Sequence, residues 1–493
     1  MILAAVNVTE ATELGLWFAL ITVIGLGAGR WRRPKAANEL DDWALGGRSF
    51  GSVLTWFLQG GSVYTTYSFI AVPALVYGKG AIGLFALPYL VVAYVVAYLL
   101  IPKLWLLAKS RGYVTTADFV RDRFGSRWLA GAVTLTGLVA TMPYVALQVY
   151  GIEICLAQTG LPVDASLWVA FILLAVVTYV SGLRSATLIA IVKDVLIWVT
   201  VLVAVIYIPI HLGGFGHAFS KVPHSSLTLP GSQIATYITL AIGSGFALFL
   251  YPHTITGALS SSSPQVVRRN SVYLPIYTIM LGLLAVLGYL AVAANVVPDK
   301  QYGSNVAVPA LLNAVFPPWF AGFGLSAIAI GALVPAAMMA IAAGNLFARN
   351  IFLELKPGAS SHQQTKASKT ASLVVKFGAV GFVVFVPTDF VINFQLAAGV
   401  WILQTLPAVF LGLLWRRLES RSLLAGWAAG TALGTFLLAQ VSFKTSSYDF
   451  ALGGHHAVLF IGIPALAVNL AIAVVGTLFA PSRVPEAAPA RAA

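Results

Sequence analysis

Three charged side chains lie in segments where charge is costly. Asp194 and Lys193 fall within the apolar stretch IVKDVLIWV, and Glu153 falls within VALQVYGIEICL. Ionised groups inside a bilayer are expensive and commonly mark an ion or solute path. Asp194 and Glu153 are therefore candidate ion-coupling residues. His253 in LYPHT is a third candidate, because an imidazole titrates closest to neutral pH.

Each of these candidates has a structural alternative. Asp194 can simply pair with Lys193, Glu153 can be a hydrogen-bonded carboxyl near the outer leaflet, and His253 can satisfy a carbonyl freed by the preceding proline. The adjacent His455 and His456 lack partners at ligand spacing, so no metal site is predicted. No cofactor is expected.

Composition places these residues in a membrane protein. Of 493 residues 59% are hydrophobic and only 9% are charged, whereas soluble proteins carry about 25% charged residues. Spans of ~20 apolar residues cross the hydrocarbon core, and short linkers separate them here. The sequence predicts one all-α polytopic domain over 1–480, in a lipid bilayer, and a disordered cytoplasmic tail over 481–493. The thirteen predicted spans are 12–29, 52–77, 81–107, 127–159, 163–182, 186–212, 233–257, 271–297, 320–352, 371–387, 391–415, 421–441 and 455–480.

The basic residues predict the orientation. With the N-terminus outside, all but four of the 29 Lys and Arg residues fall in cytoplasmic segments. This bias predicts an outer N-terminus and a cytoplasmic C-terminus in the cell membrane. The net charge of +13 is then a consequence of topology, and no nucleic-acid partner is expected. The four exceptions are Lys79, Lys221, Lys300 and Lys444.

Several spans contain helix-breaking residues. The second span has Gly60 and Gly61 among polar residues, the seventh has Pro252, and the ninth has Pro335. Backbone groups freed by such breaks are tolerated only where they line a cavity or are buried in protein. Discontinuous helices therefore point to a transport site. A helix-packing face of small residues is the alternative for the glycine pair.

Three motifs give the chain a family resemblance. These are WALGGRSFG (43–51) before the second span, LYPHT (250–254) in the seventh and AGNLFARNIF (343–352) closing the ninth. In this order, with the broken second span, the chain resembles the sodium:solute symporter family. Within that family the region around the second span and VKFGAVGFVVF (375–385) are most similar to bacterial monocarboxylate permeases, which take up lactate, pyruvate, acetate and alanine.

The resemblance implies a LeuT-like fold of two inverted five-helix repeats, 52–212 and 233–415, with an added first span and peripheral helices over 421–480. It also places the substrate near the midplane, between the broken second and seventh spans. Several of the site candidates serve equally well as contacts between helices. The candidate substrate-binding residues are Gln59, Gly60, Gly61, Ser62, Thr65, Tyr144, Gln148, Tyr251, His253, Trp401 and Gln404.

The ion site departs from the family pattern. Carried over by the resemblance, the shared sodium site has the Gly61 and Tyr64 carbonyls, and Val334 and Pro335 where hydroxyls belong. Neither residue has a side-chain oxygen, which Na⁺ as a hard cation requires, and no Ser or Thr occurs over 331–350. We expect a vestigial sodium site and proton coupling; coupling to sodium is the alternative.

These observations predict a symporter that imports short monocarboxylates such as lactate, pyruvate, acetate or propionate by alternating access. A sodium-coupled carrier of an amino acid or another small solute is the nearest alternative. An enzyme is not expected, because HExxH, GxSxG and a Cys–His pair at suitable depth are absent. A channel would need symmetric pore segments or charged rings, and none is visible. No obligatory protein partner is evident.

Overall fold

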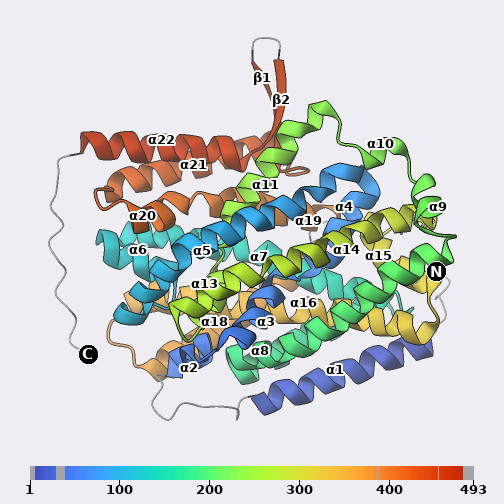
Figure 1. Ribbon diagram of the computed structural model, residues 1–493. Coiled ribbons are helices and arrows are strands. Elements are labelled where there is room, and N and C mark those ends of the chain that lie inside the picture. The colour runs from blue at the N-terminus through green and yellow to red at the C-terminus, as the bar shows by residue number, and fades with distance from the viewer. Residues whose placement is uncertain (1–5, 29–38, 386–387, 453–454, 481–493) are drawn as a thin grey trace.

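The protein is a bundle of membrane-length helices with one small hairpin (Figure 1). The computed structural model describes residues 6–28, 39–385, 388–452 and 455–480. Within these residues ten helices are long and apolar enough to cross a membrane, and one bent pair makes an eleventh. This confirms the expected all-α polytopic membrane protein.

The first half of the chain forms the helices up to α8. Here and below, η denotes a short 3-10 or π-helical segment. The elements are α1 (Val8–Ala28), α2 (Glu39–Leu45), η1 (Gly46–Arg48), α3 (Ser52–Val63), η2 (Tyr67–Ala71), α4 (Val72–Lys79), η3 (Gly80–Phe85), α5 (Ala86–Arg111), α6 (Thr116–Phe124), α7 (Arg127–Ala157) and α8 (Val163–His211).

The second half continues with shorter connecting helices and ends at the hairpin. Its elements are α9 (Phe215–Ser220), α10 (His224–Leu227), η4 (Gly231–Gln233), α11 (Ile234–Leu248), α12 (Pro252–Leu259), α13 (Pro264–Tyr273), α14 (Pro275–Ala293), η5 (Ser304–Val306), α15 (Ala307–Val315), α16 (Pro318–Phe347), η6 (Ala348–Phe352), α17 (Leu353–Leu355), α18 (Ser361–Phe385), α19 (Thr388–Leu403), η7 (Pro407–Leu411), α20 (Gly412–Leu414), α21 (Ser420–Gln440), β1 (Ser447–Leu452), β2 (His455–Phe460) and α22 (Gly462–Phe479).

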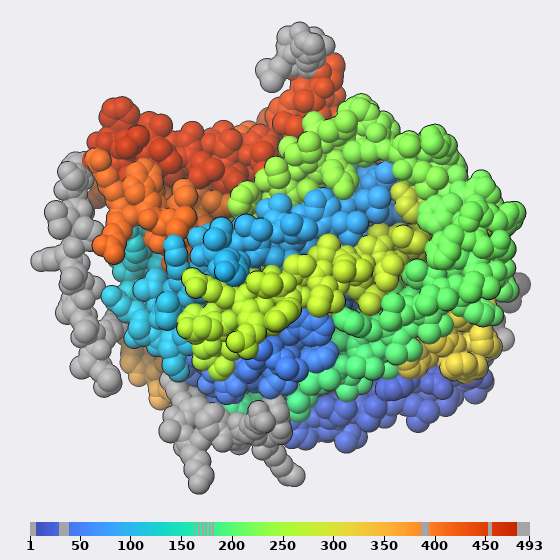
Figure 2. Space-filling model, in the orientation of Figure 1, coloured from blue at the N-terminus to red at the C-terminus, as the bar shows by residue number. Residues whose placement is uncertain are grey.

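The central helix is α16, which packs against α7, α8, α18 and α1. It carries no ionisable side chain, so it forms the apolar interior of the bundle. On the outside, α5 and α14 lie side by side across one face (Figure 2). They expose large apolar residues there, including Val95, Leu99 and Ile279. An exposed apolar face of this kind suits contact with lipid.

Two predicted boundaries differ from the structure. The spans 163–182 and 186–212 form one element, α8, interrupted at Gly182 (φ 58°, ψ −151°). A Cβ at Gly182 would lie 2.7 Å from Trp43 Cδ1, so glycine is required on both counts. The predicted span 455–480 is wrong at its start, because 455–460 is strand β2.

The hairpin explains that second difference. β2 pairs with β1 in antiparallel register, from Ser447 opposite Phe460 to Leu452 opposite His455. Neighbouring side chains of a strand alternate between its faces, and HHAVLF fits a short strand as well as a helix end. His455 and His456 therefore lie in β2 rather than in a loop. The predicted tail, 481–493, lies outside the described residues.

The first helix break lies just beyond the glycine pair. α3 remains helical through Gly60 and Gly61 and ends at Val63, where Tyr64 turns extended (φ −78°, ψ 90°). A Cβ at Gly60 would lie 2.0 Å from the Tyr277 ring. The pair therefore makes room for a neighbouring helix, and the predicted unwinding occurs one turn later.

The second break matches the prediction from LYPHT, whereas the third predicted interruption is absent. The helical segment ending at Leu248 and α12 meet at an angle of 49°, and Pro252 takes the first turn of α12, where its missing N–H is harmless. α16 continues straight through Pro335 as a 30-residue helix.

The two broken helices are joined at one end. Phe50, just before α3, accepts a hydrogen bond at its carbonyl from the Ser262 amide (2.8 Å) and donates through its own amide to the Ser260 carbonyl (3.2 Å), just after α12. These backbone bonds fix the position of α3 relative to α12.

The contact between Gly60 and Tyr277 gives a stability prediction. Gly60→Ala places a methyl group inside the tyrosine ring, and overpacking of this kind costs about 1–3 kcal/mol. We expect a lower melting temperature for the purified protein. Gly131→Ala on α7 is the control, because a Cβ there meets nothing within 4 Å. Equal melting temperatures for Gly60→Ala and the unmodified protein would contradict the packing described here.

Candidate functional site

The break after α3 leaves several carbonyls without helical partners, and a lysine side chain binds two of them. The last hydrogen bond of α3 runs from the Tyr64 amide to the Gly60 carbonyl. Lys193 Nζ, from α8, donates to the Gly61 carbonyl at 3.0 Å and to the Tyr64 carbonyl at 3.1 Å. The side chain of Lys193 is completely buried. Lys193 Nζ thus lies at the carbonyls that the family resemblance implies for a vestigial sodium site.

Asp194 compensates the charge of this ammonium. Its carboxylate lies 3.2 Å from Lys193 Nζ and accepts a hydrogen bond from the Tyr277 hydroxyl at 2.5 Å. Tyr64 in turn donates to the Tyr277 carbonyl at 2.8 Å. All four side chains are buried. A buried charge pair with hydrogen bonds on both members is more favourable in a low dielectric than either charge without its partner.

Side chains also close the far side of this break. The Thr66 amide donates to Gln148 Oε1 at 2.9 Å, and Gln148 Nε2 donates to the Tyr144 carbonyl at 3.1 Å. Thr65 Oγ1 accepts from the Tyr67 amide at 3.0 Å. The broken backbone is therefore held from α8 on one side and from α7 on the other.

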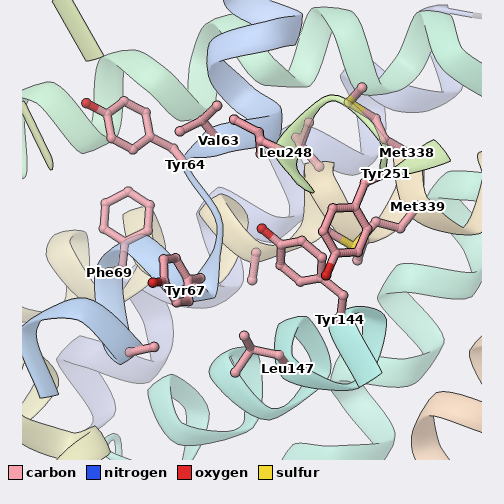
Figure 3. Packing of buried hydrophobic residues seen from close by; sticks show 14 of the residues in the cluster. Val63, Tyr64, Tyr67, Phe69, Tyr144, Leu147, Leu248, Tyr251, Met338 and Met339 are labelled. Carbon is pink, nitrogen blue, oxygen red and sulfur yellow. The ribbon is translucent and has the colours of Figure 1, made fainter. Parts of the chain in front are cut away.

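A small cavity lies beside both breaks. Its volume is about 40 Å³, and tyrosines form much of its wall. Figure 3 shows the Tyr144 and Tyr251 rings next to each other, while Tyr64 points away from them. Tyr67 is the first residue of η2, and Tyr251 lies in the second break. The lining residues are Tyr67, Tyr89, Tyr144, Ser244, Ala247, Leu248, Tyr251, Gln395, Leu396 and Gly399.

Some of the buried polar atoms without a hydrogen-bond partner lie at or beside this cavity. Within the described residues, the Tyr251 hydroxyl, Gln395 Oε1 and both ring nitrogens of His253 are buried without a hydrogen-bond partner. The His253 ring lies 5.4 Å from the Tyr144 ring, centre to centre. Buried polar groups normally have partners, so orphaned ones beside a cavity point to a missing polar ligand or water.

The remaining predicted substrate contacts divide into two groups. Near the breaks, Gln59 Nε2 donates to the Thr254 carbonyl at 3.3 Å, joining α3 to α12, and Ser62 Oγ donates to its own helix. On α19, the Trp401 indole donates to Thr435 of α21, and Gln404, directly after α19, accepts a hydrogen bond from Asn469 of α22. The structure thus places these two residues in contacts with α21 and α22.

Glu153 lies in a separate contact. Tyr302, in the loop after α14, donates to Glu153 Oε1 at 2.9 Å. Burial, and then the Glu153 carboxylate, raise the pKa of the Tyr302 hydroxyl above its ordinary value, so this hydroxyl remains a donor. Of the three predicted ion-coupling residues, Asp194 lies at the first break, His253 beside the cavity and Glu153 in this third environment.

The sequence analysis missed several residues of this site. The sequence analysis treats Lys193 only as a neighbour of Asp194, although a cation within an apolar span itself indicates a functional position. Tyr277, Tyr67, Tyr89 and Gln395 gave no such indication, because buried aromatic and amide residues are common in membrane helices. Val334 and Pro335 are buried in α16 and have no side-chain oxygen to offer.

The fold and the broken helices define a secondary transporter, and comparison with known proteins identifies its family. The sodium:solute symporter family matches residues 43–430, so the chain belongs to this family. It is 46% identical to a "Monocarboxylate transport permease protein" of Rhizobium johnstonii, over 97% of this chain and 99% of the relative. It is 24% identical to the sodium/pantothenate symporter of Escherichia coli, over 95% and 96% of the two chains.

A solved structure confirms the expected LeuT-like symporter fold. A Na⁺-coupled sialic acid symporter, in a substrate-bound outward-open state, superposes with a TM-score of 0.78 at 15% identity. The match covers 96% of this chain and 98% of that one. At this identity the likeness concerns the fold alone. The chain is a multi-pass membrane protein of a symporter family.

The role of Gln148 at the first break gives a second prediction. Gln148→Leu leaves the Thr66 amide buried without an acceptor, which costs about 1–3 kcal/mol. We expect a lower melting temperature and slower transport. Gln440→Leu, at an exposed position of α21, should change neither. An unchanged melting temperature for Gln148→Leu would show that the break needs no acceptor from α7.

Proposed function

We propose that this protein imports short-chain monocarboxylates, such as lactate, pyruvate, acetate or propionate, by proton-coupled alternating access. The observation that carries the proposal is the tyrosine-lined cavity between the two helix breaks. The name of the Rhizobium johnstonii relative supports the same substrate class. The distribution of the Lys and Arg residues between the connecting segments supports an outer N-terminus and a cytoplasmic C-terminus.

The size of the cavity favours a very small solute. A buried water needs roughly 10–15 Å³ of such volume, so 40 Å³ holds about three waters. A two- or three-carbon acid approaches this size. A sugar or a large amino acid would require a wider site, and alternating access supplies one only by moving the surrounding helices.

The chemistry of the wall favours a carboxylate with an apolar end. Aromatic faces of Tyr67, Tyr89 and Tyr144 suit a methyl or ethyl group. The Tyr251 hydroxyl is a hydrogen-bond donor without a partner in the described part of the chain. His253 adds a second donor, and when protonated it adds a positive charge. A carboxylate accepts hydrogen bonds only, so both groups match it.

Coupling to protons is supported by the ion site. A Na⁺ ion requires several oxygen ligands. The carbonyls of Gly61 and Tyr64, which would be two of them, accept hydrogen bonds from Lys193. Sodium coupling is the competing hypothesis, because the family contains sodium symporters.

Counterflow in proteoliposomes tests the substrate class. Liposomes loaded with unlabelled lactate should accumulate labelled lactate transiently, and external pyruvate, acetate or propionate should suppress the signal. Glucose and proline should leave it unchanged. Counterflow of a sugar or an amino acid, with none of any monocarboxylate, would contradict the proposal. A stimulation by sodium alone at constant pH would favour the competing coupling.

The cavity residues can be tested against the α19 candidates. Tyr251→Phe removes only a hydroxyl, and the loss of one donor to a charged group costs about 1.5–3 kcal/mol. We expect KM for lactate to rise roughly 10-fold or more. Trp401→Phe serves as the control, because its indole bonds Thr435, and its KM should stay unchanged. A raised KM for Trp401→Phe together with an unchanged KM for Tyr251→Phe would indicate that the substrate binds at α19 instead.

A further inference from the structure

We propose that Lys193 is the proton-binding group of this transporter, and that its ammonium takes the place of the coupling cation at the first helix break. This inference rests on the proposed function and names the residue that performs its coupling. The sequence analysis put forward Asp194, Glu153 and His253 for this role; the geometry points instead to the neighbouring lysine.

The position of the ammonium carries the argument. Carbonyl oxygens that converge at a broken helix are ligands for a cation, and here two of them lie 3.0 and 3.1 Å from Lys193 Nζ. The Asp194 carboxylate oxygen lies 3.2 Å from the same nitrogen. An ammonium has three N–H donors; two hydrogen bonds go to these carbonyls, and the Asp194 oxygen lies at ion-pair distance. A tethered cation therefore fills the place that a free cation would occupy.

Little space remains for a second cation at this point. A Cβ at Gly61 would lie 3.2 Å from Lys193 Nζ and 3.4 Å from Ala190 Cβ. The lysine side chain is fully buried, as are those of Tyr64 and Tyr277. Sodium would have to displace the ammonium, and the two would repel each other in a low dielectric.

The charged surroundings of Lys193 are simple. Asp194 lies beside it on α8, Tyr64 directly follows α3, and Tyr277 comes from α14, with Tyr94 of α5 beyond them. α16, which packs along α8, has no ionisable side chain. The charged or titratable groups on the other elements packed against α8 are Glu10 and Glu13 of α1, Glu39, Asp41 and Asp42 of α2, Arg48 of η1, Arg127 and Glu153 of α7, His217 of α9, and His362, Lys366, Lys369 and Lys376 of α18.

Several of those groups have contacts of their own. Glu10 is bonded to Asn7 and Glu153 to Tyr302, while the α2 carboxylates pair with Arg48 and Arg184. Among the described residues, the ion pair of Lys193 is with Asp194. Loss of its proton would therefore remove the cation from the break directly.

The proton and the substrate are linked through the same three residues of backbone. Tyr64 to Thr66 separate α3 from η2; Lys193 binds the Tyr64 carbonyl, and Tyr67 lines the cavity. The protonated lysine holds the break against α8 while the anion is bound. On the cytoplasmic side the ammonium gives one proton to water and becomes a neutral amine. Asp194 keeps its negative charge and its hydrogen bond from Tyr277.

This cycle balances charge. The loaded carrier holds one ammonium, one carboxylate of Asp194 and one substrate carboxylate. The returning empty carrier holds a neutral amine and the Asp194 carboxylate. Both forms carry the same net charge, so one proton enters with each anion and transport is electroneutral.

The test compares net uptake with exchange in proteoliposomes. Lys193→Arg keeps a cation at the carbonyls, but a guanidinium does not release its proton. It should retain lactate counterflow and lose the several-fold acceleration of net uptake by an alkaline interior. Lys193→Gln, a second variant without any charge, should also lose this acceleration. Lys376→Gln is the matched control, because Lys376 is a buried lysine whose Nζ has no hydrogen-bond partner in the described part of the chain. This variant should keep the acceleration of net uptake.

The outcomes separate this inference from the proposed function. Absence of lactate counterflow in the unmodified protein rejects the proposed function itself. If the unmodified protein exchanges lactate, acceleration by the pH gradient that survives in Lys193→Arg or Lys193→Gln overturns the role of Lys193. Loss of the acceleration in Lys376→Gln overturns its specificity. Acceleration of the unmodified protein by an imposed membrane potential at constant pH overturns the charge balance.

Discussion

The structure depends on how the backbone of a broken membrane helix is satisfied. No water inside a bilayer replaces the lost hydrogen bonds, and each unsatisfied group costs several kcal/mol. After α3 the freed carbonyls of Gly61 and Tyr64 accept from Lys193, and the Thr66 amide donates to Gln148. These bonds come from opposite sides, from α8 and from α7. The conformation of the break, and with it the position of Tyr67 in the cavity wall, follows from them.

This constraint connects the charged and the aromatic parts of the site. Lys193 requires Asp194, because an isolated buried ammonium would be unstable. Asp194 requires the Tyr277 hydroxyl, and the Tyr277 ring requires a glycine at position 60. Lys193, Asp194, Tyr277 and Gly60 therefore depend on one another, each through a contact with the next. A change in the protonation of Lys193 would act on each of these residues.

Much of the fold was predictable from the sequence, because apolar length and basic bias are strong signals in membrane proteins. The all-α multi-pass class, the second break at LYPHT and the family were predicted correctly. Thirteen spans were predicted, whereas the described residues contain ten or eleven membrane-length helices. The hairpin formed by β1 and β2 was not predicted, since a short segment such as HHAVLF fits a strand or a helix end equally well. The break near Gly60 was displaced by one turn, because a glycine allows both unwinding and close packing. Only the position of the Tyr277 ring distinguishes the two.

The site was less predictable for a physical reason. Its members are common residues that become functional through contacts between distant segments, such as Lys193 with Gly61 and Tyr144 with Tyr251. The sequence predicted that Val334 and Pro335 offer no side-chain oxygen to sodium, but not that Lys193 binds the carbonyls of Gly61 and Tyr64. The assignments of individual residues to substrate and ion binding, and the repeat boundaries at 52–212 and 233–415, remain predictions.

The central claim is that an ammonium, and not a sodium ion, occupies the carbonyls of the first break. A high-resolution experimental map of the purified protein in sodium chloride tests it most directly. The account predicts continuous side-chain density from the α8 backbone to a point near 3 Å from the carbonyl oxygens of Gly61 and Tyr64, as found here for Lys193 Nζ. A separate ion peak between those oxygens, with the lysine side chain turned elsewhere, would contradict it.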